Sequence, residues 1–361
     1  MEHKIKVGFV STYPPVVSGL SRYAEELCDF LNANESFIEA EKLSTDKRTV
    51  YKRATSQNIG ECDLLVYNLG NHPMNIPAFE FALRFPSICV LHEYHIPSLA
   101  GGKFKTTVLK KKSPIEMLVD AGNVFIVHSS DNKKKLENAG AHAKLIREFF
   151  FSTSSGKPSK KESFFGVFGY ISPSKGANEI LKGYLNYKTR GGKTPLVFAG
   201  NTAEYNLKDA LNKMNLRDTV TVIENPADSF YDSLMLSCSA AVNLRLKDSG
   251  ETSANMLKLF SLGKVVAMNR IESIEDYFDN CFFEIDPLRS EEMLSDFFFA
   301  VDEKSANLAI ISEKAKEIVT KYHSLEKIGL EWTALLKELI HRKSREALKN
   351  KRKTFIWTGK I

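Results

Sequence analysis

The sequence has few cysteines, and no two of them lie at the CxxC spacing of redox or zinc motifs. The five cysteines stand singly in otherwise apolar segments: Cys28, Cys62, Cys89, Cys238 and Cys281. Buried thiols in a reducing compartment explain such positions better than a disulfide framework does. The N-terminus, "MEHKIKVGFV", also lacks the basic segment and long apolar run of a secretory signal. We therefore expect a cytoplasmic protein.

Metal-binding patterns and long hydrophobic runs are absent as well. The eight histidines show no zincin spacing, and no Asp-x-Asp pair is present to hold a metal ion against a diphosphate. No apolar run approaches the ~20 residues that a membrane-spanning helix needs. The sequence thus predicts no metal site and no membrane-spanning segment.

The positive charge is concentrated at the C-terminus. The formal net charge is +6, and residues 337–360 hold nine basic residues against two glutamates, so the rest of the chain is about neutral. A nucleic-acid groove would spread Lys and Arg over a folded face, so we expect no nucleic-acid partner.

Two segments combine basic residues in a way that suits a lipid surface. The tail "KNKRKTFIWTGKI" mixes cations with aromatic and aliphatic side chains, a composition that suits an anionic bilayer surface. Residues 103–112 contribute five lysines: Lys103, Lys105, Lys110, Lys111 and Lys112. Membrane contact at the inner face of a membrane, a solvated and partly disordered tail, and a protein partner are the alternatives for these segments.

The length and the periodicity predict the fold class. A chain of 361 residues exceeds what one hydrophobic core usually fills, so we expect two domains. Short aliphatic runs such as "KVGFVST" and "TPLVFAGN" alternate with amphipathic stretches until about residue 290, after which the pattern is helical. This predicts an α/β protein with two Rossmann-like, doubly wound parallel-sheet domains and C-terminal helices. The expected boundaries are residues 1–152, a linker at 153–163, residues 164–325, and a helix with a basic tail at 326–361.

Two loops of the first half follow strands in positions where such sheets bind ligands. In "STYPPVVSGLSRYAEEL" the prolines and Gly19 form a turn before a helix whose first N–H groups can receive an oxygen of a phosphate or sugar. A plain turn glycine is the alternative. In "VLHEYHIPSL" the side chain of His92 can hydrogen-bond a substrate or take a proton, or it can simply be satisfied by nearby backbone. The second possibility is favoured for His95.

Two further loops of this kind occur in the second half. In "FGYISPSKGANEIL", Lys175 stands before a helix start, where an ammonium adds to the attraction of the helix for a phosphate. In "NLRLKDSGETSANML", Arg245 is expected to end a strand and to reach a diphosphate, while Glu251, Thr252 and Ser253 cap a helix. A solvated lysine, and an ordinary capped helix with a surface ion pair, are the alternatives.

Together the four loops resemble one family. The order "PPVVSG", "LHE", "FGYISPSKG" and "NLRLKDSGETSANMLKLFSLGKVV" is similar to that of the GT-B fold glycosyltransferases of family 4. The resemblance runs from about residue 4 to residue 335 and includes "YHSLEKIGLEW". It implies a retaining, metal-independent transfer of a sugar from a nucleotide diphosphate sugar, without a cofactor, to a glycan or lipid-linked acceptor. The donor is then expected on the second domain and the acceptor on the first.

The resemblance also assigns roles to individual residues. It implies that Lys175 and Arg245 hold the diphosphate, aided by backbone amides of Gly250, Thr252 and Ser253. Gly19 would let the backbone approach the donor. His92, which would contact the transferred sugar, and Glu251 are the catalytic candidates.

The sequence departs from the pattern of the family at three positions. The family usually has an arginine where this chain has Tyr170, and its two glutamates, eight residues apart, fall on Gly250 and Lys258. Glu251 lies one position from the first, but an ammonium at Lys258 cannot accept a hydrogen bond from a ribose hydroxyl. A non-catalytic GT-B fold subunit that binds glycan or scaffolds another glycosyltransferase is therefore the main alternative. A GT-B fold sugar-nucleotide epimerase is a further one.

Overall fold

The computed structural model describes residues 4–16, 18–101, 112–153 and 163–357, with side chains of the last helix described as far as Arg342. Most of the predicted linker at 153–163, four of the five lysines in residues 103–112, and the last four residues of the tail lie outside the described residues. The chain forms two compact units. Unit 1 contains residues 1–128, 133–147 and 325–361, and unit 2 contains residues 129–132 and 148–324.

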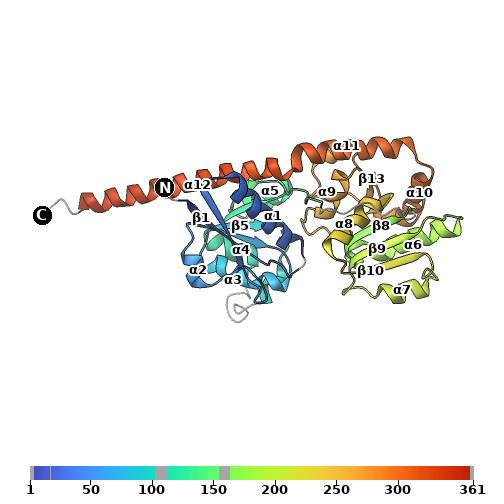
Figure 1. Ribbon diagram of the computed structural model, residues 1–361, viewed down its shortest axis with the longest axis horizontal. Helices are drawn as coiled ribbons and strands as arrows, with labels where there is room; N and C mark the ends of the chain where they lie inside the picture. Colours follow the sequence, from blue (N-terminus) through green and yellow to red (C-terminus); the bar gives the residue numbers. More distant parts are fainter. Residues whose placement is uncertain (1–3, 17, 102–111, 154–162, 358–361) are drawn as a thin grey trace. The chain divides into compact units, whose positions relative to one another are not determined.

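Unit 1 is built on a seven-stranded parallel sheet with the strand order β3-β2-β1-β4-β5-β6-β7. Figure 1 labels β1 and β5 among the strands of this sheet. Its strands are β1 (Ile5–Ser11), β2 (Ile38–Ser44), β3 (Lys52–Arg53), β4 (Leu64–Leu69), β5 (Ile88–Leu91), β6 (Val124–Val127) and β7 (His142–Leu145). The helices of this part of the chain are α1 (Gly19–Asn34), α2 (Ser56–Gly60), α3 (Ile76–Arg84), α4 (Pro114–Asp120), α5 (Ser130–Asn138) and α12 (Leu325–Trp357). The apolar strands β4, β5 and β6 are buried, as alternating strands and covering helices require.

Unit 2 is built on a six-stranded parallel sheet with the order β10-β9-β8-β11-β12-β13 (Figure 1). Its strands are β8 (Phe165–Tyr170), β9 (Leu196–Asn201), β10 (Val220–Glu224), β11 (Ala240–Val242), β12 (Val265–Met268) and β13 (Phe283–Glu284). Its helices are α6 (Ala177–Thr189), α7 (Leu207–Lys213), α8 (Asp228–Ser237), α9 (Ala254–Ser261), α10 (Ser290–Asp302) and α11 (Ala306–His323). Apolar side chains on both faces of the sheet form two buried clusters.

The two parallel-sheet α/β units and the helical C-terminal part confirm the predicted fold class. Two details differ from the sequence prediction. The strand before Arg245 ends already at Val242, so Arg245 lies in the following loop rather than at the strand end. The first helix begins at Gly19 itself, whereas the sequence placed this glycine in the turn before the helix. None of the described helices is long and apolar enough to cross a membrane.

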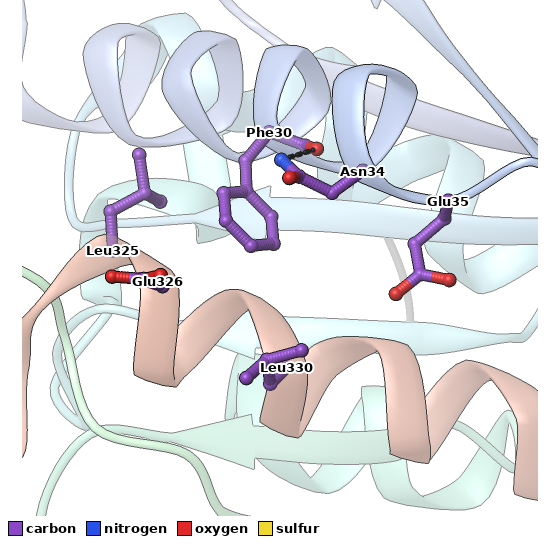
Figure 2. Close-up of a pocket in the computed structure, with 6 residues that line it drawn as sticks. All are labelled: Phe30, Asn34, Glu35, Leu325, Glu326 and Leu330. Atoms are coloured by element: carbon purple, nitrogen blue, oxygen red, sulfur yellow. Dashed lines mark hydrogen bonds between the residues drawn. The ribbon is translucent and has the colours of Figure 1, made fainter.

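The last helix, α12, packs against α1 within unit 1. Trp332 is fully buried, and its indole Nε1 donates a hydrogen bond to the hydroxyl of Tyr23 on α1 at 3.0 Å. Figure 2 shows an open groove of about 490 Å³ between the two helices, into which the ring of Phe30 projects. The groove is lined by Phe30, Asn34, Glu35, Leu325, Glu326 and Leu330. It contains none of the predicted site residues.

Gly329 leaves no room for a side chain where α12 packs against α1. A Cβ atom at this position would lie 2.1 Å from Cε1 of Phe30. Gly329→Ala should therefore lower the free energy of unfolding by about 1–3 kcal/mol, although alanine is the better helix former. Chemical denaturation checks this. Gly19→Ala is the matched control, because its new methyl group would meet no atom within 4 Å and should leave stability unchanged or slightly higher. Equal stabilities for the two variants would contradict the close packing.

Candidate functional site

Two loops of unit 2 meet at the point where the strand order of its sheet reverses. The strands β8 and β11 are hydrogen-bonded neighbours, although helices and two other strands separate them in sequence. The loop after β8 holds Lys175, and the loop after β11 holds Arg245. Open α/β sheets bind ligands at the carboxyl ends of strands at such a switch point. The sheet topology therefore brings the two predicted phosphate ligands together.

The loop after β8 is packed tightly against the loop after β11. Lys175 ends a short 3-10 helix, Pro173–Lys175, and Gly176 then turns into α6 with a φ of 70°. A Cβ atom at Gly176 would lie 2.8 Å from the Cβ of Leu244. The backbone N–H of Leu246 donates a hydrogen bond to the carbonyl of Ser174 at 2.9 Å. These contacts fix the position from which Lys175 extends.

Arg245 is held by its backbone as well as by its side chain. Its N–H donates to Oδ1 of Asn269, which follows β12, and its carbonyl accepts from Nδ2 of the same residue, both at 2.7 Å. The side chain is only 7% exposed. The arginine is thus a fixed, buried cation, and Asn269, which has no charge and no motif, is a site residue that sequence reasoning did not find.

Glu251 connects the two cations. Its Oε2 accepts from Nζ of Lys175 at 2.8 Å and from Nη1 of Arg245 at 2.5 Å. Burial alone would raise the pKa of this carboxyl, but the positive charges of Arg245 and Lys175 hold the pKa well below its usual range. Glu251 is therefore ionised throughout the physiological range and is the residue on which the cluster centres.

Gly250 has a conformation that a glutamate would adopt only with strain. Its φ is 76°, in the left-handed region. Its carbonyl accepts from Nδ2 of Asn132, and its N–H donates to Oδ1 of Asp248, both at 2.7 Å. The loop conformation therefore favours glycine at position 250. The carboxylate is carried by the next residue, Glu251.

The helix after this loop begins as expected. Ser253 is the N-cap of α9: its hydroxyl accepts from the N–H of Met256 at 3.3 Å and from Nδ2 of Asn243 at 2.8 Å. The buried Oγ1 of Thr252 has no hydrogen-bond partner among the described residues. Ser253 therefore does the capping, and Thr252 retains hydrogen-bonding capacity.

Lys258 lies on the buried side of α9. Its ammonium pairs with the carboxylate of Asp232 on α8, and the two side chains are 2% and 0% exposed. A buried ion pair of this kind is costly to break, because either charge would be left uncompensated. The alternative stated for this helix, a surface ion pair, is therefore wrong for Lys258, because its ion pair is buried. Its ammonium is already occupied by Asp232 and is not available to a ligand.

Glu148 is a buried carboxyl that sequence reasoning missed. Its residue is 4% exposed, in the segment that enters unit 2. Burial raises its pKa to about 8, the negative charge of Glu251 adds to this effect, and Arg245 opposes it. At neutral pH the carboxyl is therefore mostly protonated. The sequence "LIREFF" carries no signal for this role except a single acid in an apolar run.

The remaining predicted residues belong elsewhere. His92 is in unit 1, directly after β5, and is 6% exposed. Its Nε2 lies 3.2 Å from Oδ1 of Asn68, and its ring contacts those of Tyr23 and His128. Gly19, also in unit 1, is the first residue of α1 after the N-cap Ser18. Tyr170, where the family pattern has arginine, ends β8 and is 45% exposed.

Acidic and histidine side chains do not gather into a metal site in the described part of the chain: no group of three or more His, Cys, Asp or Glu residues is placed to bind a metal ion. Lys175 and Arg245 supply the positive charge of the cluster around Glu251.

The raised pKa of Glu148 predicts a specific pH dependence of stability. The folded state holds this proton up to about pH 8, whereas an unfolded glutamate loses it near pH 4.5. Stability contributed by the protonated carboxyl is therefore lost as the pH rises between these values, by about 1.4 kcal/mol per pH unit. Glu148→Gln cannot lose a proton, so its free energy of unfolding should rise relative to that of the parent protein from pH 5 to pH 8. Denaturation at a series of pH values measures the difference, with the exposed Glu291→Gln as control. A constant difference would contradict the buried, protonated state.

Comparison with known proteins completes the description. No protein-family model matches the chain, and no curated protein matches it. Solved structures do match: sucrose-phosphate synthase from Thermosynechococcus elongatus has a TM-score of 0.71 and 11% identity, over 94% of this chain and 100% of that chain. Anabaena HepE in complex with UDP-glucose has a TM-score of 0.68 and 15% identity, over 92% and 100%.

WaaG, a glycosyltransferase involved in lipopolysaccharide biosynthesis, has a TM-score of 0.62 and 12% identity, over 90% of this chain and 98% of that chain. All three comparisons cover both sheets and nearly the full length of each chain. With its two parallel-sheet α/β units and C-terminal helices, the chain has the GT-B fold that these glycosyltransferases share.

Proposed function

We propose that the protein is a glycosyltransferase that moves a sugar from a nucleotide diphosphate sugar to a glycan or lipid-linked acceptor. The transfer retains the anomeric configuration and needs neither a metal ion nor a cofactor. The donor binds to unit 2, with Lys175 and Arg245 as its diphosphate ligands. The acceptor binds to unit 1.

The observation that carries this proposal is the meeting of two cations at the switch point of the second sheet. Lys175 and Arg245 come from loops 70 positions apart, and both reach the same carboxylate oxygen. A leaving diphosphate needs positive charge to stabilise it, and a preorganised pair of cations supplies that charge in place of a metal ion. The GT-B fold supports the donor assignment further, because HepE, which has this fold, was solved with UDP-glucose.

The remaining predicted residues take the following roles in this proposal. Gly250 shapes the loop, and backbone amides near Thr252 and Ser253 add to the diphosphate site. His92 contacts the transferred sugar, and Gly19 allows the backbone to approach the donor. Glu251 acts at the reacting sugar once it is released from the cations.

The membrane contact predicted for residues 103–112 and the C-terminal tail belongs to the same proposal. The backbone of α12 is helical as far as Trp357, so a basic segment there extends from unit 1 as a helix. A lipid-linked acceptor at an anionic membrane surface would suit it. Sedimentation with anionic vesicles, with and without residues 343–361, tests this part: equal sedimentation of the two forms would contradict it.

A non-catalytic subunit is the second candidate, and two observations favour it. The first glutamate position of the family pattern is a glycine with positive φ, and the second is a lysine in a buried ion pair. A protein of this kind would bind a nucleotide sugar or a glycan without turning the donor over. Binding and turnover therefore have to be measured separately.

Calorimetry with a panel of nucleotide sugars tests donor binding. At least one donor should bind, and Lys175→Ala should weaken it by about tenfold or more, because one charge-assisted hydrogen bond contributes about 1.5–3 kcal/mol. Arg245→Ala should weaken it at least as much. Lys182→Ala is the matched control, since Lys182 also forms a 3.0 Å ion pair in unit 2, but with Glu291 on α10.

Release of nucleotide from the bound donor then separates the two candidates. Turnover that depends on added acceptor indicates a transferase, whereas binding without any turnover indicates the non-catalytic subunit. Absence of binding by the folded protein, or an affinity that Lys175→Ala and Arg245→Ala leave unchanged, would show that the donor site is wrongly placed.

A further inference from the structure

Both proposed phosphate ligands are already paired with one side chain of the protein itself, the carboxylate of Glu251. One oxygen of Glu251, Oε2, lies 2.8 Å from Nζ of Lys175 and 2.5 Å from Nη1 of Arg245. Charge-assisted hydrogen bonds of this length are among the strong ones. A phosphoryl oxygen that used the same two nitrogen atoms would have to occupy the same position.

We propose that Glu251 is an internal anion that holds the phosphate-binding position between Lys175 and Arg245, so that a diphosphate binds there only by displacing this carboxylate. The inference rests on the proposed function, because it concerns the same site. It adds a property that the function does not require, namely that the protein carries its own competitor for the diphosphate.

The three side chains differ in their freedom to move. Arg245 is 7% exposed, and both its N–H and its carbonyl are bonded to Asn269. Lys175 and Glu251 are 28% and 35% exposed, so both side chains have a route to solvent. An arriving anion attracts the lysine and the arginine but repels the carboxylate, which is therefore the member that leaves, while the arginine stays in place.

A phosphate would also use donors that the carboxylate leaves unused. Nε of Arg245 and Oγ1 of Thr252 are buried, and neither has a hydrogen-bond partner among the described residues. An unsatisfied buried polar group destabilises the folded protein. The tetrahedral oxygens of a phosphoryl group can reach more donors than one shared carboxylate oxygen does, which favours the exchange.

The internal anion sets a threshold for binding. A ligand must first offset the two ion pairs of Glu251, and its apparent affinity is reduced by the fraction of molecules in which the site is open. A single phosphoryl group replaces one anion by another and gains little. A diphosphate brings a second phosphoryl group and more negative charge, so its binding free energy can exceed the cost of displacing the carboxylate of Glu251.

Calorimetry with inorganic pyrophosphate and, separately, with inorganic phosphate tests the inference. Glu251→Gln keeps the shape and an acceptor oxygen but removes the charge. The variant should bind pyrophosphate about tenfold or more tightly than the parent protein does, as expected if the site is open in about a tenth of the molecules or fewer. It should also bind phosphate at concentrations where the parent protein shows no heat. Glu291→Gln, which removes the carboxylate of the Lys182 ion pair, should change neither affinity.

Three results would overturn the inference. Weaker pyrophosphate binding by Glu251→Gln would mean that the carboxylate positions the cations for the ligand rather than competing with it. Unchanged binding, or no binding by either protein, would mean that the anion does not take this position. If thermal unfolding shows that the glutamine variant is not folded, Glu251→Ala takes its place, and its pyrophosphate and phosphate binding is judged by the same criteria.

The outcome is separable from that of the proposed function. Tighter pyrophosphate binding by the variant, with no nucleotide sugar bound or turned over, would support the internal anion and refute the transferase. Turnover of a nucleotide sugar, with no effect of Glu251→Gln on the affinity for pyrophosphate, would support the transferase and refute the internal anion.

Discussion

The candidate site of the second unit depends on one contact, the carboxylate of Glu251 between two cations. The contact exists because β8 and β11 are hydrogen-bonded neighbours, so that the loops after them emerge side by side. Each loop is fixed separately, the first by Gly176 against Leu244 and the second by Asn269. Without the carboxylate, a lysine and a buried arginine would repel each other at a place where water reaches only part of the cluster. The free protein therefore needs an anion there, and Glu251 supplies it.

The charge balance of the cluster extends to Glu148. A second ionised carboxylate beside Glu251 would leave no net positive charge for a phosphate. Burial keeps Glu148 protonated at neutral pH, and its pKa of about 8 places the change of charge just above that range. The site thus combines an ionised carboxylate, which is held by two cations, with a neutral one. Environments that separate the titration of two neighbouring carboxyls in this way are typical of functional sites.

The departures from the family pattern have a structural explanation. A glutamate in place of Gly250 would have to adopt a φ of 76°, which strains any residue with a Cβ. Lys258 is matched by the buried Asp232, so the two positions form one compensated pair. The loop of this chain is therefore internally consistent at both positions.

The hydrophobic pattern was sufficient to predict most strands and helices, because buried parallel strands read as short apolar runs. It did not indicate β2 and β7, because their sequences "IEAEKLS" and "HAKL" are largely polar. Both strands lie at or next to an edge of the first sheet, where polar side chains can reach solvent. The sequence by itself determined the α/β class, the two sheets, and the choice of Lys175 and Arg245 as cations at or after the ends of strands. Only the tertiary structure decided that these cations share one carboxylate, that Lys258 is paired, and that Glu148 is protonated. The reason is physical: pairing and pKa depend on distance and burial, and residues far apart in the chain set both.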